Sequence, residues 1–246
     1  MDMRAYVKRL GIQDCRHCEE IVRLQAPENK DIHAAPLFWQ GAGRVGIPLV
    51  FIGINPSVVG TSNEPLRGED FDRYFDYYQD RARSEEETRR LPQPKRVPFA
   101  YWTRCENLAR KILVDHPVER WRDYVLMEVI HCFFDRANHL DPEGFDRVAR
   151  KCFTRHTRKI LEDLMPQKLV LLGIPAYDIF RKFMGMGSVE KYGFGSIRLG
   201  GRTIGVMRHP HQGDKISGSW YREDAYRKFH EYCLRLPLSM DAPGDK

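Results

Sequence analysis

A short apolar run that ends abruptly in turn residues limits most strongly what this chain can fold into. The run LVFIGI, residues 49–54, is followed by Asn55, Pro56 and Ser57. Such a run is typical of a strand that is buried on both faces of a parallel sheet. Gly53 lets the backbone approach another group closely, and Pro56 stiffens the turn. Asn55 is therefore predicted at the carboxyl end of a central strand, where open α/β sheets place their ligands.

The rest of the chain alternates between strand-like and helical patterns. Apolar, strand-like runs cover residues 47–55, 123–132, 168–173, 196–199 and 202–207. Helical spacing covers residues 101–113, 142–164, 175–184 and 219–235, and Asp141-Pro142 is a favourable helix start. Strands that alternate with helices predict βαβ units. We expect one domain over residues 1–246, a three-layer α/β/α sandwich with a short central parallel sheet.

Three segments stand outside this alternation. Residues 1 to about 34 are predicted as a helical N-terminal segment. Residues 64–96 form a charged insertion that mixes Glu and Arg and ends in a Pro cluster. We interpret it as an exposed helix followed by a loop, and as a solvated face more readily than a DNA clamp. Residues from about 237 to 246 are predicted to be a frayed tail.

Composition sets broad bounds on the partners and the location. Lys and Arg number 40 against 34 Asp and Glu, a net charge of +6 that permits polyanion binding without requiring it. There is no run of about 18 apolar residues, so no membrane span is expected. The N-terminus lacks an apolar signal core, so a cytoplasmic protein is predicted, and we expect a monomer. Six cysteines are then thiols or metal ligands rather than disulfides.

Three motifs, taken together, resemble the uracil-DNA glycosylase superfamily. GINPS, residues 53–57, is similar to the first motif of the mismatch-specific uracil/thymine glycosylases. His209-Pro210 follows a strand-like run and resembles the second motif. Val97-Pro98-Phe99 resembles the Pro-Phe that supplies an aromatic stacker for a flipped base. The resemblance extends from about Cys15 to about Tyr232.

The resemblance implies a DNA repair enzyme that hydrolyses the N-glycosidic bond of a deaminated or damaged base flipped out of DNA. In that role Asn55 orients the water and His209 stabilises the departing base. The base is held by Gly53, Ile54, Pro56, Phe99 and Glu128. The DNA is contacted by Ser57 and by a minor-groove loop with His211, Gln212, Lys215 and Ile216.

Each of these residues also has a purely structural interpretation. Asn55-Pro56 is compatible with an ordinary Asn turn. His209 is compatible with a structural histidine that has its hydrogen bonds satisfied, and Phe99 with a core residue. His211 is close enough in sequence to exchange roles with His209.

The cysteines carry a further part of the resemblance. Cys15 and Cys18 form a C-x-x-C pair, a spacing that lets two thiolates grip one metal centre. With Cys132, predicted to end a strand, and Cys152, on the long helix, they resemble the four ligands of the iron–sulfur uracil-DNA glycosylases. That set implies a [4Fe–4S] cluster, with zinc as the competing metal. The alternative is four unrelated buried thiols, which is also what we expect of Cys105 and Cys233.

Glu128 departs from the pattern of these relatives. In the resembling enzymes, an Asn four positions before the strand-ending Cys pairs with N3–H and O4 of uracil, and here that position is Glu128. A carboxylate accepts hydrogen bonds and donates none unless it is protonated. We expect Glu128 to point into the base pocket, where burial raises its pKa. This departure predicts either a substrate other than uracil or a loss of activity.

Two other functional classes stay open. Glu128 favours a non-catalytic member of the superfamily that binds nucleic acid and recognises DNA ends or modified bases. A nucleotide-handling α/β hydrolase or transferase is the other alternative. The sequence has no P-loop and no G-x-G-x-x-G to support that class.

Overall fold

The computed structural model describes residues 3–11, 15, 46–54, 97–115, 117–118, 123–131, 142–189, 193–209 and 223–237. A five-stranded sheet with the order β2-β1-β3-β5-β4 forms the centre of this part. The strands are β1 (Leu49–Gly53), β2 (Tyr124–Glu128), β3 (Lys168–Leu172), β4 (Phe194–Leu199) and β5 (Arg202–His209). Strands β2, β1, β3 and β5 are parallel, and the edge strand β4 pairs antiparallel with β5. The predicted fold class is confirmed.

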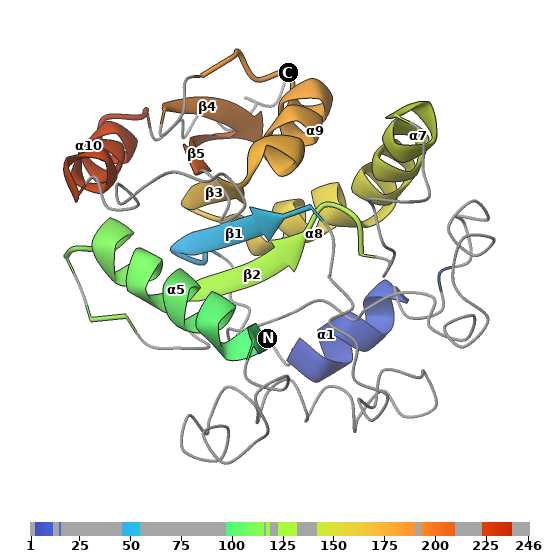
Figure 1. Cartoon of the computed structure of the whole chain (residues 1–246), viewed down its shortest axis with the longest axis horizontal. Coiled ribbons are helices and arrows are strands. Elements are labelled where there is room, and N and C mark those ends of the chain that lie inside the picture. Colours follow the sequence, from blue (N-terminus) through green and yellow to red (C-terminus); the bar gives the residue numbers. More distant parts are fainter. Residues whose placement is uncertain are drawn as a thin grey trace, which may run out of the picture.

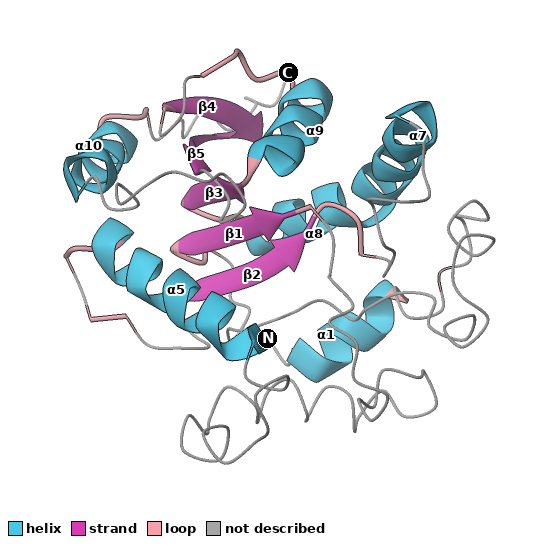
Figure 2. Cartoon of the chain, in the orientation of Figure 1, coloured by secondary structure: helices cyan, strands magenta, loops and turns pink. Residues whose placement is uncertain are grey.

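Helices cover both faces of the sheet, as Figures 1 and 2 show. One face carries α5 (Val97–Ile112) and α10 (Glu223–Leu234). The other carries α7 (Pro142–Cys152), the π-helical segment η3 (Phe153–Thr157), α8 (Arg158–Leu164) and α9 (Ile174–Met184). The short helix α1 (Met3–Leu10) lies on this second face. None of the described helices is long and apolar enough to cross a membrane.

The strands β1, β2 and β3 are apolar except for Glu128 at the end of β2 and Lys168 at the start of β3, because both faces of these strands are covered. Every residue of Leu49–Gly53 and of Lys168–Leu172 is buried. Leu49 and Phe51 face the α5/α10 layer, whereas Val50 and Ile52 face the α7–α9 layer. This alternation follows from the two-residue period of a strand, and it fixes which face each residue at the strand ends points to.

The N-terminal helix is tied to the second layer by one polar contact. The Tyr6 hydroxyl donates a hydrogen bond of 2.8 Å to Asp163 Oδ2 on α8. The buried Tyr6 ring joins the apolar cluster of that face. Burial and the Asp163 carboxylate raise the pKa of this hydroxyl. The contact brings the chain that leads to Cys15 close to α8.

Several predicted boundaries need correction. The second strand ends at Glu128 and is followed by a bend at Val129 and Ile130, so it stops short of Cys132, which lies outside the described residues. The helix predicted to begin at residue 101 begins at Val97. Pro98 is tolerated in its first turn because the N–H groups there have no helical partner. Phe99 therefore lies on a helix and not just after a strand. The charged insertion 64–96 and residues 238–246 of the tail lie outside the described residues.

Candidate active site

One row of residues crosses the carboxyl ends of four neighbouring parallel strands. Glu128 on β2 is paired with Gly53 on β1, and Leu172 on β3 is paired with His209 on β5. The pairing of Ile52 with Leu171 places Gly53 beside Leu172 and completes the row. Three strand spacings of about 4.8 Å separate the backbone of Glu128 from that of His209 by about 14 Å.

Glu128 and His209 point to the same face of the sheet. Leu126 on β2 and Met207 on β5, each two residues earlier, pack in the cluster under α5 and α10. Side chains two residues apart in a strand share a face. Both ionisable groups thus face the α5/α10 layer, with the side chain of Leu172 and the bare Cα of Gly53 between them.

Glu128 is buried without an ion-pair partner among the described residues. Its side chain is 7% exposed, and its Oε2 atom has no hydrogen-bond partner there. Burial raises its pKa to about 8, so the carboxyl group is mostly neutral at pH 7. This is the direction expected from the sequence.

The Glu128 carboxyl group occupies the space that a side chain at position 53 would fill. A Cβ atom built at Gly53 would lie 2.8 Å from Glu128 Cδ and closer still to Oε2. The close backbone approach predicted for Gly53 is therefore an approach to the Glu128 carboxyl. The Gly53 and Ile54 carbonyls also accept hydrogen bonds of 2.9 Å from the backbone N–H groups of Val129 and Ile130, so the start of GINPS is fixed to the bend after β2.

His209 is held from two sides. Its backbone carbonyl accepts a 2.8 Å hydrogen bond from the N–H of Gly173, which directly follows β3. Its Nε2 atom lies 3.0 Å from the hydroxyl of Tyr226 on α10, and the two rings are nearly parallel. A hydroxyl partner on Nε2 fixes the orientation of the ring. The side chain is buried. Burial and a fixed orientation fit a structural histidine and a pre-oriented catalytic histidine equally well.

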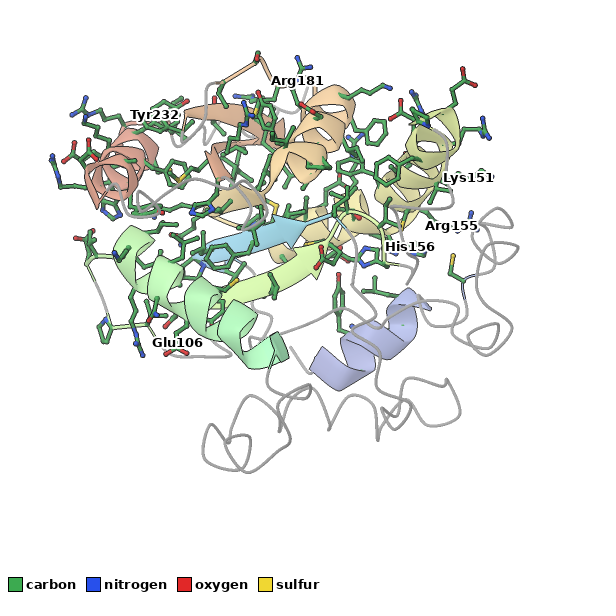
Figure 3. All side chains as sticks on the ribbon, viewed as in Figure 1. Glu106, Lys151, Arg155, His156, Arg181 and Tyr232 are labelled. Atoms are coloured by element: carbon green, nitrogen blue, oxygen red, sulfur yellow. The ribbon has the colours of Figure 1, made fainter. Side chains whose placement is uncertain are left out.

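A second polar cluster surrounds Cys15 and Cys152. Cys152 Sγ lies 3.2 Å from the backbone N of His131, the residue directly before Cys132. Cys15 Sγ lies 3.3 Å from Nε2 of His156. His156 follows Cys152 by one helical turn, and in Figure 3 it lies between that helix and α1, while Lys151 and Arg155 project outward.

Thr157 connects this cluster to the end of β2. Its hydroxyl donates a hydrogen bond of 2.9 Å to the carbonyl of Val129. Because that proton is used, the hydroxyl oxygen accepts from His131 Nε2 at 3.1 Å. Burial and the nearby His156 lower the pKa of His131 to about 3, so its ring is neutral.

These contacts bring together the chain segments that carry Cys15, Cys132 and Cys152. Backbone and imidazole N–H groups directed at sulfur are the hydrogen bonds that thiolate ligands of iron–sulfur clusters accept. Among the described residues, no group of three or more His, Cys, Asp or Glu side chains could hold a metal ion. Cys18 and Cys132 lie outside that part of the chain, so the predicted four-cysteine set stays a prediction.

Several other predicted site residues also lie outside the described part of the chain: Asn55, Pro56, Ser57, His211, Gln212, Lys215 and Ile216. Phe99 is placed in the first turn of α5, without a described side chain. Its predicted role as a base stacker is therefore untested. Cys105 is a core residue, as predicted, and Cys233 packs against the same cluster.

The sequence interpretation missed the polar partners of the site: Tyr226, His131, His156 and Thr157. For His156 a signal was present, since the spacing Cys-x-x-x-His puts Cys152 and His156 on one side of a helix. Tyr226 gave no local signal, because it reaches His209 only through the packing of α10 on β5.

Comparison with known proteins gives no further guide. No protein-family model matches the chain, and no curated protein matches it.

Proposed function

We propose that this protein is a monofunctional DNA glycosylase that hydrolyses the N-glycosidic bond of a deaminated or damaged base flipped out of DNA. The observation that supports it most is the row at the carboxyl edge of the sheet. Glu128 and His209 share one face there, and they flank Gly53, the first residue of GINPS. This edge is where open α/β sheets bind ligands.

The proposed chemistry follows from the demands of the reaction. Cleavage leaves a sugar with oxocarbenium character and a base that departs as an anion. A positioned imidazole lowers the energy of that anion by donating a hydrogen bond, and His209 is the candidate. The side-chain carbonyl of Asn55 would orient the attacking water, and Phe99 would stack on the extruded base.

The second part of the proposal is a metal centre held by cysteines, close to His131 and His156. Cys15, Cys18, Cys132 and Cys152 are the proposed ligands of a [4Fe–4S] cluster, with zinc as the alternative metal. Such a centre would supply a cross-link that joins the N-terminal segment, the end of β2 and α7. A cytoplasmic location, where thiols stay reduced, belongs to the same proposal.

The test is release of free base. Protein purified without oxygen is incubated with oligonucleotides that each carry one uracil, hypoxanthine, xanthine or mispaired thymine. We expect release of at least one of these bases, and its loss in His209→Ala. Steeply salt-dependent DNA binding without any release would favour the second candidate, a non-catalytic nucleic-acid-binding protein, for which the departure at Glu128 is the specific argument.

A further inference from the structure

The carboxyl group of Glu128 is the polar group of the described chain that most needs an explanation. It is 93% buried, and Oε2 has no hydrogen-bond partner among the described residues. The other buried atom in that condition, Nε of Arg181, belongs to a side chain that is only partly buried. Native proteins satisfy nearly all buried polar atoms, so an unsatisfied one points to a role such as contact with a ligand.

On the side that faces β1, this carboxyl group meets no side chain among the described residues, because the residue there is Gly53. Oε2 lies against the Cα of Gly53, where any side chain would displace it. The next positions of the row are Leu172 and His209. A ligand between Glu128 and His209 would therefore rest on the backbone of Gly53 and the apolar side chain of Leu172.

No described charge explains the protonation state of Glu128. Burial alone raises its pKa to about 8. Ionisable side chains on this face include Cys105 from α5, Tyr226 from α10, His209 from β5 and, at the opposite end of the sheet, Lys168 from β3. The part of β1 on this face contributes only Leu49, Phe51 and Gly53.

We propose that Glu128 determines the specificity of the site as a neutral carboxylic acid, binding a nucleobase edge that offers one hydrogen-bond donor beside one acceptor. This inference rests on the proposed function. The acid O–H donates to a ring carbonyl oxygen while the acid C=O accepts from the adjacent ring N–H. Uracil offers such an edge at N3–H and O4, and hypoxanthine offers one at N1–H and O6. An ionised carboxylate has only acceptors and would require two adjacent donors.

The experiment compares the affinity of three proteins for one probe. The probe is a single-stranded oligonucleotide with one 2′-fluoro-deoxyuridine, which resists hydrolysis, and the reference is the same strand with a 2′-fluoro abasic analogue. The proteins are the parent, Glu128→Gln and Glu128→Leu, each measured below and above about pH 8. Glu106→Gln is the matched control, since Glu106 is a buried acid that already pairs with Arg110.

The neutral-acid account makes a distinct prediction for each protein. The parent should prefer the uracil probe over the reference by about tenfold below pH 8 and lose most of that preference above it. Glu128→Gln should keep the preference at both pH values, because an amide always has one donor and one acceptor. Glu128→Leu should lack it at both, and Glu106→Gln should behave as the parent.

Two outcomes would overturn the inference while leaving the proposed function standing: base release that Glu128→Leu does not impair, or a parent preference that does not change with pH. Absence of both preference and base release in the parent, for every base in the panel, would instead defeat the proposed function and this inference with it.

A further variant keeps the test valid even if Glu128→Leu does not fold. Gly53→Ala keeps Glu128 but displaces its carboxyl group. It should lose the preference below pH 8 as Glu128→Leu does, and an unchanged preference in a folded Gly53→Ala protein would count against the inference.

Discussion

The burial of Glu128 lowers the free energy of unfolding, and unfolding experiments can detect this effect without any substrate. An unsatisfied buried polar group costs about 1–3 kcal/mol, and more when it is charged. The folded protein holds the proton of Glu128 up to about pH 8, whereas the unfolded chain releases it near pH 4.5. In that window the unfolded state binds fewer protons, so the free energy of unfolding falls as the pH rises.

Glu128→Gln should therefore stabilise the protein by about 1–3 kcal/mol at neutral pH, with a smaller effect at pH values below 4.5. The reason is that the carboxylate of the unfolded chain must take up a proton when it is buried on folding, whereas the amide is neutral in both states. Urea unfolding at several pH values measures the difference. A variant with the same stability as the parent at every pH would show that Glu128 is not buried in this way.

Tyr226 acts on the site through His209. Tyr226→Phe removes the hydroxyl 3.0 Å from His209 Nε2 but keeps the buried ring. If His209 stabilises the departing base, loss of the group that orients it should lower kcat for base release by about 10- to 100-fold. The KM should change little, since Tyr226 lies behind the histidine.

Tyr177→Phe is the control for that experiment. The Tyr177 hydroxyl also has a structural partner, the backbone N of Val189 at 2.6 Å, but it lies in the other layer. Equal losses of kcat in both variants would assign the Tyr226 effect to general destabilisation.

At the scale of elements, the π-helical segment η3 links the helix layer to the end of β2. A π-helical turn inside an α-helix changes the facing of the residues that follow it, and such turns are frequent at functional sites. Here His156 and Thr157 both point inward, to Cys15 and to the bend after β2. This turn therefore positions the two side chains that contact Cys15 and the bend after β2.

Thr157→Val should cost about 1–2 kcal/mol of unfolding free energy, because it leaves the Val129 carbonyl and His131 Nε2 without their described partner. Denaturant unfolding measures the loss. Thr154→Val, at an exposed position of the same segment, should be close to neutral. A neutral Thr157→Val would mean that the link between η3 and β2 contributes nothing to stability.

The elements themselves were largely predictable, for a physical reason. Strands such as β3 are apolar on both faces after their first residue, and this local pattern is enough to identify them. The start of α5 was missed because a Pro in Val97-Pro98-Phe99 is as compatible with a loop as with the first turn of a helix. The end of β2 was missed because the apolar residues Val129 and Ile130 continue the strand pattern into a buried bend.

The side chains that contact the site residues were harder to predict than the site residues themselves. Gly53 and His209 were found because GINPS and His-Pro follow strand-like runs, and Glu128 was found because the resembling enzymes carry an Asn four residues before the cysteine that aligns with Cys132. The contacts His209–Tyr226 and Cys15–His156 join residues that are 17 and 141 positions apart. No period or short motif encodes such pairs, which appear only when the layers are packed.

For the whole molecule, the proposed cysteine centre would add a metal cross-link between the N-terminal segment and the rest of the fold. Protein purified without oxygen should be brown and contain iron and sulfide. Cys152→Ser should lose both and expose the segment around Cys15 to proteolysis, because the cross-link is gone. Cys105→Ser, in the opposite layer, should retain them. Zinc in place of iron would identify the alternative metal, and absence of any metal would refute the centre.

The central claim is that a base binds at the carboxyl edge of the sheet, between Glu128 and His209. Photo-crosslinking with an oligonucleotide that carries one 5-iodouracil, followed by peptide mapping, tests it most directly. We predict adducts in the segments that begin at this edge, residues 54–57, the first turn of α5 around Phe99, or residues 209–216. Adducts confined to the hollow of about 400 Å³ beside Asp146 and Arg181, or to the amino edge of the sheet, would contradict it.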